Sequence, residues 1–381
     1  MSEKTPRTRA VRAGLNTDRN ANAVIPPVML SSAFRRDDPA VQPQFDYART
    51  NNPGRCQLAD AITALEGAAA GLVTASGMAA IDLLFHDLPH GARVVCSHDA
   101  YGGTRRLLDA RARGGRFEAV YADLTQLDTA RAAITQGTAL VMAETPSNPR
   151  LRIADIAALA EMAHMAGAEL AVDNTVLSPA LQRPIELGAD YSVQSVTKLI
   201  NGHSDMVGGA VCMADEAKLE RLYWWTNCAG VGGGGFDSYL ALRGLRTLPL
   251  RAKAQSQSAL EIAQWLAEDR RIAHVDYPGL TTHPGHDLAA RQQDSFGQLI
   301  SIQLAGDLNP REVVQRLQIF TLAQSLGGVE SLSNIPALMT HAAMTPQARA
   351  QAGIPDTLIR LSVGLESACD LIDDLDAALQ A

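Results

Sequence analysis

Aromatic residues and long hydrophobic runs are scarce in this chain of 381 residues. Phe, Trp and Tyr together make up only 4% of the sequence. No run of about 20 apolar residues occurs, so we expect no membrane span and no membrane partner. Hydrophobic residues nevertheless account for 46% and charged residues for 19%. This balance indicates a folded protein with a large core rather than a disordered chain.

Cysteine is also sparse, and the cysteines form no pair or metal motif. Their number is odd, they lie far apart, and no C-x-x-C pattern is present, which favours reduced thiols in a cytoplasmic protein. A catalytic thiol is one interpretation, but a buried free thiol is the commoner case. The two histidines in the turn at 283–286 lack a cysteine or acid cluster nearby, so we expect no metal site. The cysteines are Cys56, Cys96, Cys212, Cys228 and Cys369.

Positive charge is outnumbered and not concentrated in one segment. Lys and Arg number 33 against 41 Asp and Glu, which gives a net charge of −8. This diffuse acidic balance argues against a nucleic-acid partner, because phosphate contacts need clustered Lys and Arg. The basic residues between positions 4 and 12 are not followed by an apolar stretch, so we expect no signal peptide and a cytoplasmic location.

From residue 58 onward, helical periodicity alternates with short apolar runs, and no internal repeat is present. This alternation is typical of the α/β class, with a mostly parallel sheet and helices on both of its faces. Helices are predicted over 58–66, 78–86, 104–113 and 153–165, and strands over 93–97, 117–121, 139–143, 169–172 and 191–194.

Polar residues follow four of these predicted strands. In sheets of this kind, ligands bind at the carboxyl ends of the strands. We therefore expect these polar segments to meet at one edge of the sheet and to form the functional site. The segments are 97–99, 144–146, 173–175 and 195–198.

The pattern changes at both ends of the chain. Prolines interrupt any helix in the first fifty residues, which we interpret as an irregular arm. After about residue 245, a long helix at 251–267, strands at 299–304 and 358–363 and a final helix from Ser367 predict a smaller α+β domain. We therefore divide the chain into an arm at 1–55, a large domain at 56–245 and a C-terminal α+β domain at 246–381.

Lys198 stands after the strand at 191–194 and before a glycine-rich segment at 207–209. A lysine at a strand end can be desolvated, which lowers its pKa and frees the amine to form a Schiff base. The hydroxyls of Ser195 and Thr197 occupy alternate positions of an extended segment, so they point to one side and suit a phosphate. The alternative interpretation is a surface lysine that follows a strand.

Asp173 and Gly77 have a functional and a simpler interpretation each. A carboxylate at a strand end could pair with the pyridinium nitrogen of a cofactor, but Asp-Asn pairs are also common in turns and helix caps. Gly77 follows Ser76 at the start of a predicted helix, where free backbone N–H groups bind phosphate. An N-capping serine without a ligand is an equal alternative there.

The segment 230–235 matches the G-x-G-x-x-G pattern of dinucleotide-binding proteins. It does not follow a clear strand, and no acidic residue lies about 20 positions further on, where Arg246 and Arg251 stand instead. We therefore reject a nicotinamide site and expect a flexible loop.

Taken together, these motifs resemble those of the cystathionine γ-synthase and γ-lyase family of pyridoxal-phosphate enzymes, over nearly the whole chain. The family's lysine signature corresponds to SVTKLINGHSD at 195–205 and is highly specific. The supporting segments agree with one another, which strengthens the assignment. They are 47–49, 52–53, 65–67, 76–78, 101–104, 144–149, 173–175, 325–331 and 358–366, and the segments 12–16, 224–225, 236–239, 291–293 and 320–322 resemble the bacterial γ-synthases most.

The resemblance implies a fold and an assembly. The fold is that of a fold-type I pyridoxal-phosphate transferase, with a mostly parallel seven-stranded sheet between helices and a smaller C-terminal α+β domain. The arm at 1–55 would contribute to the neighbouring subunit's site. The assembly would be a homotetramer, built from dimers that share their sites.

The resemblance also implies a role for each site residue. Lys198 would be the Schiff-base lysine and proton shuttle, Asp173 would pair with the pyridinium nitrogen, and Tyr101 would stack on the ring and assist proton transfer. The phosphate would be held by Gly77, Met78, Ser195 and Thr197, joined by Tyr47 and Arg49 from the neighbouring subunit. The substrate carboxylate would be held by Arg360, helped by Asn148 and Ser325.

The implied reaction is a γ-replacement that belongs to transsulfuration and methionine biosynthesis. It joins an O-acyl-L-homoserine, succinyl or acetyl, with L-cysteine to give L-cystathionine. Two positions depart from γ-synthases that use the succinyl ester: Thr50 replaces a second arginine, and Gln324 replaces a glutamate. Arg106 would still be available for a distal carboxylate. Residues 335–337 resemble γ-lyases, so a γ-lyase, a β-lyase and an O-acylhomoserine sulfhydrylase remain alternatives.

Overall fold

The computed structural model describes residues 4–342 and 346–380, and its larger sheet has seven strands. Within this sheet β7 (Gly209–Met213) runs antiparallel to both its neighbours, β1 (Ala70–Thr74) and β6 (Tyr191–Gln194), and the other pairs are parallel. The prediction of a mostly parallel seven-stranded sheet is therefore confirmed. In spatial order the strands are β1 (Ala70–Thr74), β7 (Gly209–Met213), β6 (Tyr191–Gln194), β5 (Glu169–Asp173), β4 (Thr138–Glu144), β2 (Ala92–Ser97) and β3 (Phe117–Ala122).

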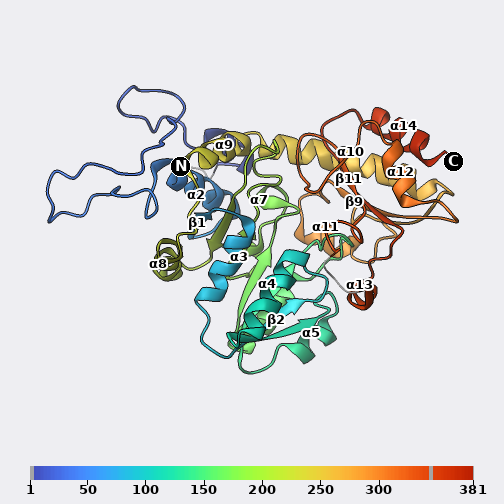
Figure 1. Ribbon diagram of the computed structural model, residues 1–381, viewed down its shortest axis with the longest axis horizontal. Helices are drawn as coiled ribbons and strands as arrows, with labels where there is room; N and C mark the ends of the chain where they lie inside the picture. The colour runs from blue at the N-terminus through green and yellow to red at the C-terminus, as the bar shows by residue number, and fades with distance from the viewer. Residues whose placement is uncertain (1–3, 343–345, 381) are drawn as a thin grey trace.

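Helices cover both faces of this sheet (Figure 1). One face packs against α3 (Gly77–His86), α4 (Gly102–Arg113) and α8 (Leu219–Ala229). The other packs against α2 (Pro53–Glu66), α5 (Leu127–Ala133), α6 (Ile156–Met165) and α7 (Ser178–Leu181). Strand alternation explains the two layers, because Val94 and Val95 of β2 belong to hydrophobic clusters on opposite faces.

The strands β1 and β7 were missing from the sequence prediction. Both contain glycine, which weakens a strand pattern, yet the structure requires it. A Cβ on Gly209 would lie 2.2 Å from the Ser76 carbonyl oxygen, and a Cβ on Gly71 would lie 2.2 Å from Thr63 Oγ1. The small residues thus let neighbouring segments approach the antiparallel edge of the sheet closely.

The segment 230–235 is not the free loop that we expected. It runs along β1, where the Ala75 N–H donates to the Val231 oxygen at 2.8 Å and the Gly233 N–H donates to the Val73 oxygen at 3.2 Å. A Cβ on Gly233 would lie 2.9 Å from the Val73 side chain. The glycines therefore serve close packing against a strand edge.

A second sheet of five strands lies in the C-terminal part of the chain. Its core is shared with the long helix α10 (Leu248–Glu268) and with α12 (Pro310–Arg316) and α14 (Ala368–Leu379). The sequence predicted two adjacent interior strands of this sheet, β12 (Leu358–Ser362) and β9 (Leu299–Leu304), and the helices α10 and α14 that begin and end this part of the chain. In spatial order the strands are β10 (Thr321–Leu322), β11 (Leu332–Asn334), β12 (Leu358–Ser362), β9 (Leu299–Leu304) and β8 (Ile272–Asp276).

The N-terminal segment projects from the large sheet as extended loops (Figure 1). It follows α1 (Pro6–Arg12), which packs against α2 and α10. The remaining helices are α9 (Gly235–Leu245), α11 (His286–Gln292) and α13 (Pro346–Ala352), with short 3-10 turns η1 (Pro184–Leu187) and η2 (Glu216–Lys218). Over residues 4–342 and 346–380, no helix combines the length and the apolar character that a membrane crossing needs.

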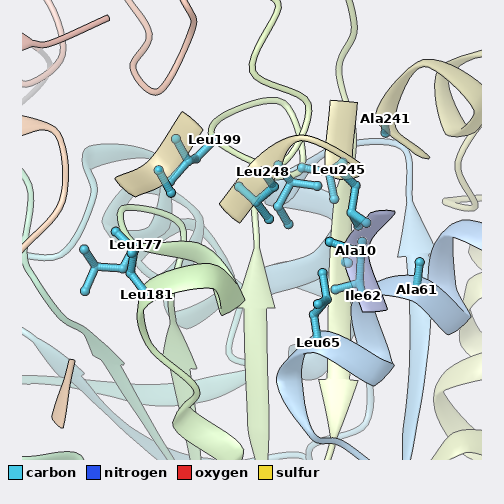
Figure 2. Close-up of a cluster of buried hydrophobic side chains, with 14 of the residues drawn as sticks. Ala10, Ala61, Ile62, Leu65, Leu177, Leu181, Leu199, Ala241, Leu245 and Leu248 are labelled. Atoms are coloured by element: carbon cyan, nitrogen blue, oxygen red, sulfur yellow. The ribbon is translucent and has the colours of Figure 1, made fainter. Parts of the chain in front are cut away.

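Figure 2 shows a hydrophobic cluster that joins helices far apart in the sequence. Ala10 of α1 lies against Ile62 and Leu65 of α2, and Leu245 of α9 and Leu248 of α10 complete this part of the cluster. All of these side chains are buried. The cluster therefore fixes α2 beneath the large sheet and connects it to α10, which leads into the second sheet.

We expect Leu245→Ala to lower the free energy of unfolding by about 2–5 kcal/mol, because it leaves a cavity in this cluster. Met165→Ala is the control, since Met165 is 69% exposed and its truncation should change stability by less than about 0.5 kcal/mol. Denaturant unfolding of both variants measures the difference. Equal stability of the two variants would contradict the role given to the cluster.

Candidate active site

A cavity of about 250 Å³ opens at the carboxyl ends of β4, β5 and β6. Residues from the second sheet region close its other side, including Ser325 and Arg360. The structure therefore brings together most of the site residues that the sequence predicted. Those that line the cavity are Gly77, Met78, Tyr101, Asn148, Asp173, Ser195, Thr197, Lys198, Ser325 and Arg360.

The Lys198 amine lies inside this cavity, where Nζ donates to Ser325 Oγ at 2.9 Å. Burial, together with a smaller effect of the positive charge of Arg360, lowers the pKa of Lys198 to about 8. A sizeable fraction of the amine is therefore neutral near pH 8. A neutral amine is the form that attacks an aldehyde.

Ser325 holds an unusual backbone conformation beside this amine. Its φ is +125°, in a region of backbone conformation that residues other than glycine rarely adopt. The Arg360 guanidinium donates to the Ser325 carbonyl oxygen at 2.6 Å, which holds the strained segment in place. In this conformation the Ser325 hydroxyl lies within hydrogen-bond distance of the Lys198 amine.

Asp173 and Glu144 end adjacent parallel strands and are partners in the register of β4 and β5. Asp173 Oδ1 accepts from the Thr175 N–H at 3.1 Å. Burial raises the pKa of both carboxyls, and for Glu144 the neighbouring Asp173 charge raises the pKa further. A cation placed next to Asp173 would offset this cost of burial, which suits a protonated ring nitrogen.

Glu144 is a cavity residue to which the sequence prediction gave no role. Its Oε2 accepts from the Tyr101 N–H at 2.5 Å, and its Oε1 accepts from the Asn148 N–H at 3.2 Å. It therefore connects the end of β4 to the start of α4 and to the loop after β4. The available signal was its place directly after a predicted strand.

The Tyr101 ring lies over the first turn of α4, close to Met78. A Cβ on Gly103 would lie 2.5 Å from Tyr101 Cε1 and 2.8 Å from Met78 Sδ. Gly103 therefore makes room for both side chains, a role that the sequence prediction also missed. The ring borders the cavity and is available to stack on a planar ligand.

The first turn of α3 meets Ser195 at one end of the cavity. Ser76 caps this helix by accepting from the Ala79 N–H at 3.1 Å, and a Cβ on Gly77 would lie 2.8 Å from Ser195 Cβ. Free N–H groups at a helix start attract phosphate. Thr197 is less free than expected, because its hydroxyl donates to the Gly208 oxygen at 3.2 Å and accepts from the Gly208 N–H at 3.0 Å.

Arg360 of β12 places a buried positive charge at the other side of the cavity. Its guanidinium donates to Asn148 Oδ1 at 2.9 Å. With its amide oxygen turned toward Arg360, Asn334 accepts from the same guanidinium at 2.5 and 3.2 Å. Burial lowers the pKa of Arg360 to about 10, so it stays charged at neutral pH. Such a group suits a substrate carboxylate.

Three predicted site residues do not line this chain's cavity. Tyr47 is 48% exposed on the N-terminal segment, and the Arg49 guanidinium lies 5.7 Å from the centre of its ring. Arg106 is exposed on α4, one turn beyond Tyr101. Cavity residues outside the predicted set include Glu144, Thr175, Gln324 and Thr340.

The donor set fits pyridoxal phosphate group by group. A partly neutral lysine amine suits its aldehyde, a buried carboxylate suits its ring nitrogen, and a helix start suits its phosphate. The position of this set at the carboxyl ends of a mostly parallel sheet defines the class as a fold-type I pyridoxal-phosphate enzyme.

The comparisons with known proteins agree with this class. The chain belongs to the Cys/Met metabolism PLP-dependent enzyme family, whose family model matches residues 7–380. It is therefore a pyridoxal-phosphate-dependent enzyme of cystathionine metabolism, and its cofactor is the one predicted from the sequence.

Individual relatives include synthases and lyases. The Escherichia coli cystathionine γ-synthase is 45% identical over 98% of this chain and 97% of its own. The Dictyostelium discoideum cystathionine γ-lyase is 41% identical over the same shares. A crystal structure of the Xanthomonas oryzae cystathionine γ-synthase in complex with cystathionine is 50% identical, with a TM-score of 0.97 over 99% of this chain and 98% of that one.

We expect the protein, once freed of cofactor, to take up pyridoxal phosphate faster as the pH rises through about 8, because the neutral Lys198 amine is the reacting form. Growth of the visible absorption band after mixing measures the rate. Arg360→Gln should move the midpoint to higher pH, since a charge that lowers the Lys198 pKa is lost.

Lys198→Ala is the control for this measurement and should give no such band. A wild-type midpoint near 10.5, the ordinary value for lysine, would contradict the desolvation of this amine.

Proposed function

We propose that the enzyme catalyses γ-replacement between an O-acyl-L-homoserine and L-cysteine to form L-cystathionine. The observation that carries this proposal is the position of Ser325 between Lys198 and Arg360. A substrate carboxylate held by Arg360 would bring the adjacent Cα toward the Lys198 amine. The higher identity to the γ-synthases than to the γ-lyase supports replacement over elimination.

Five of the cavity residues then have a defined task. Pyridoxal phosphate supplies an electron sink for the negative charge that forms at the substrate Cα. Lys198 Nζ accepts the Cα proton and later returns it. Asp173 would keep the ring nitrogen protonated, and Tyr101 would stack on the ring and assist the proton transfers. Arg360 and Asn148 orient the substrate through its carboxylate.

The exchange at Cγ balances without a further reactant. A proton leaves Cβ, the Cγ–O bond breaks, and the acyl group departs as a carboxylic acid. The cysteine sulfur forms the new Cγ–S bond, and protons return to Cβ and Cα. The products are cystathionine and one carboxylic acid, which accounts for every atom of the two substrates.

The phosphate end and the assembly are part of the same proposal. Gly77, Met78, Ser195 and Thr197 would hold the phosphate from within the chain. Tyr47 and Arg49 are exposed on the projecting arm, so we propose that they complete the neighbouring subunit's cavity, in dimers that pair into a tetramer. The division into an arm at 1–55, a large domain at 56–245 and a C-terminal domain at 246–381 suits this arrangement.

A cystathionine γ-lyase is the second candidate function, supported by the Dictyostelium relative and by the segment 335–337. A β-lyase and an O-acylhomoserine sulfhydrylase would use the same cofactor site. Gln324 lines the cavity at the position where the succinyl-ester synthases that this chain resembles carry a glutamate, so this site has one negative charge fewer than theirs.

We expect purified enzyme to form cystathionine from cysteine with O-succinyl- or O-acetyl-homoserine, and to release keto acid from cystathionine alone more slowly. Chromatographic detection of cystathionine and a keto-acid assay measure the two reactions. Rapid keto-acid release without synthesis from either ester would establish a lyase instead. Formation of homocysteine with sulfide, but not of cystathionine with cysteine, would establish a sulfhydrylase.

We further expect Arg106→Ala to raise the KM for O-succinyl-homoserine by roughly two- to fivefold, because an exposed ion pair contributes at most about 1 kcal/mol. The KM for O-acetyl-homoserine should not change, because its acyl group carries no carboxylate. Arg113→Ala, an exposed arginine at the far end of α4, is the matched control. An equal effect on both esters would show that Arg106 does not contact a distal carboxylate.

A further inference from the structure

The strand ends that carry the cavity residues also have a far side, turned away from the cavity. Glu144, Asp173 and Ser195 line the cavity, and the side chains next to them in the sequence point the other way because strands alternate. Asn174 and Gln194 are two of these far-side residues, and both are fully buried. Buried side-chain amides need hydrogen-bond partners, so the partners of Asn174 and Gln194 identify the residues that support the strand ends from behind.

Their common partner is Glu66, the last residue of α2. Glu66 is fully buried, and its Oε1 accepts from Gln194 Nε2 at 2.6 Å, from Ser192 Oγ at 2.7 Å and from Asn174 Nδ2 at 3.4 Å. One oxygen atom thus connects the ends of β5 and β6. Leu65, its neighbour on α2, lies in the hydrophobic cluster that fixes this helix (Figure 2).

The network extends to the third strand end through Gln182. Asn174 Nδ2 donates to the Gln182 carbonyl oxygen at 2.7 Å, and Gln182 Nε2 donates to Asn174 Oδ1 at 3.1 Å. The same Nε2 donates to the carbonyl oxygen of Thr145, which follows Glu144, at 2.7 Å. The ends of β4, β5 and β6 are therefore joined behind the site.

We propose that Glu66 is a positioning residue of the cofactor site, which holds Asn174 and Gln194 from behind and so fixes the spacing between Asp173 and the turn that carries Lys198. The inference rests on the cofactor site alone and does not depend on which substrate reacts. Glu66 does not touch the cavity, so it acts only through its neighbours.

The protonation behaviour of Glu66 indicates that the position of its accepting oxygen matters more than the charge of the carboxyl. Burial raises the pKa of Glu66 to about 7, although three hydrogen bonds oppose the shift. Its Oε2 is buried without a hydrogen-bond partner in the described part of the chain. A proton on Oε2 leaves all three bonds to Oε1 intact, so an amide at this position would keep them as well.

The test compares Glu66→Gln, which keeps the accepting oxygen, with Glu66→Leu, which removes it. The readouts are the visible absorption band of the cofactor-loaded protein, its midpoint on pH titration, and kcat and KM. For Glu66→Leu we expect a higher midpoint of the pH titration. A ring nitrogen that pairs less well with Asp173 would withdraw less electron density from the bond between Lys198 and the cofactor. We also expect kcat to fall roughly 10–100-fold, as for other supporting residues behind a site.

Glu66→Gln should match the wild type in all of these readouts. Glu169→Leu is the control for loss of a glutamate, because Glu169 lies at the opposite end of β5, where it pairs with Lys218. If Glu66→Leu does not fold, Gln194→Met removes one of the three donors and should move the midpoint in the same direction by less. The thermal midpoint of the cofactor-free variants reports folding separately.

An unchanged absorption midpoint in Glu66→Leu and Gln194→Met, with only a lower thermal midpoint, would overturn the proposal. A shift in Glu66→Gln as large as in Glu66→Leu would overturn it too, because charge rather than position would then matter. The absorption midpoint and the thermal midpoint need no substrate, so failure of the γ-replacement proposal would leave this part of the test intact.

Discussion

The chemistry of the site depends on the partial removal of the Lys198 amine from water beside a buried cation, Arg360. Both groups have neutral hydrogen-bond partners: Ser325 for the amine, and Asn148 and the Ser325 carbonyl for the guanidinium. Because a guanidinium holds its proton far more tightly than an amine, the lysine is the group that gives up its charge. The cavity therefore holds a nucleophile and a fixed positive charge side by side.

Much of this arrangement could be predicted from the sequence because it follows from strand ends. Asp173 stands directly after a predicted strand and Lys198 stands four residues after the next one, and parallel strands bring their carboxyl ends to one edge. Arg360 was found only through the family resemblance, since it lies within a strand of another sheet. Gly103 and Glu66 were missed because their roles are contacts between segments distant in the sequence, which no local pattern encodes.

Several of the strands that the fold prediction missed carry small or exposed residues. The strands β1 and β7 carry small residues where neighbouring backbone approaches, so they lack the bulky alternating pattern of a strand. In the second sheet, both residues of β10 and two of the five residues of β8 are exposed, so neither strand shows a buried run. Hydrophobic periodicity detects long runs of bulky apolar residues, whereas these strands are short, partly exposed or built from small residues.

The strained Ser325 belongs to the half of the cavity wall that the C-terminal region supplies, whereas Lys198 belongs to the large sheet. The basicity of the amine is therefore a property of the closed arrangement of both halves. If the C-terminal wall withdrew, water would reach the amine, its affinity for protons would return toward that of a free lysine, and it would cease to react. The reactivity of this amine therefore depends on the contact between the large sheet and the C-terminal region.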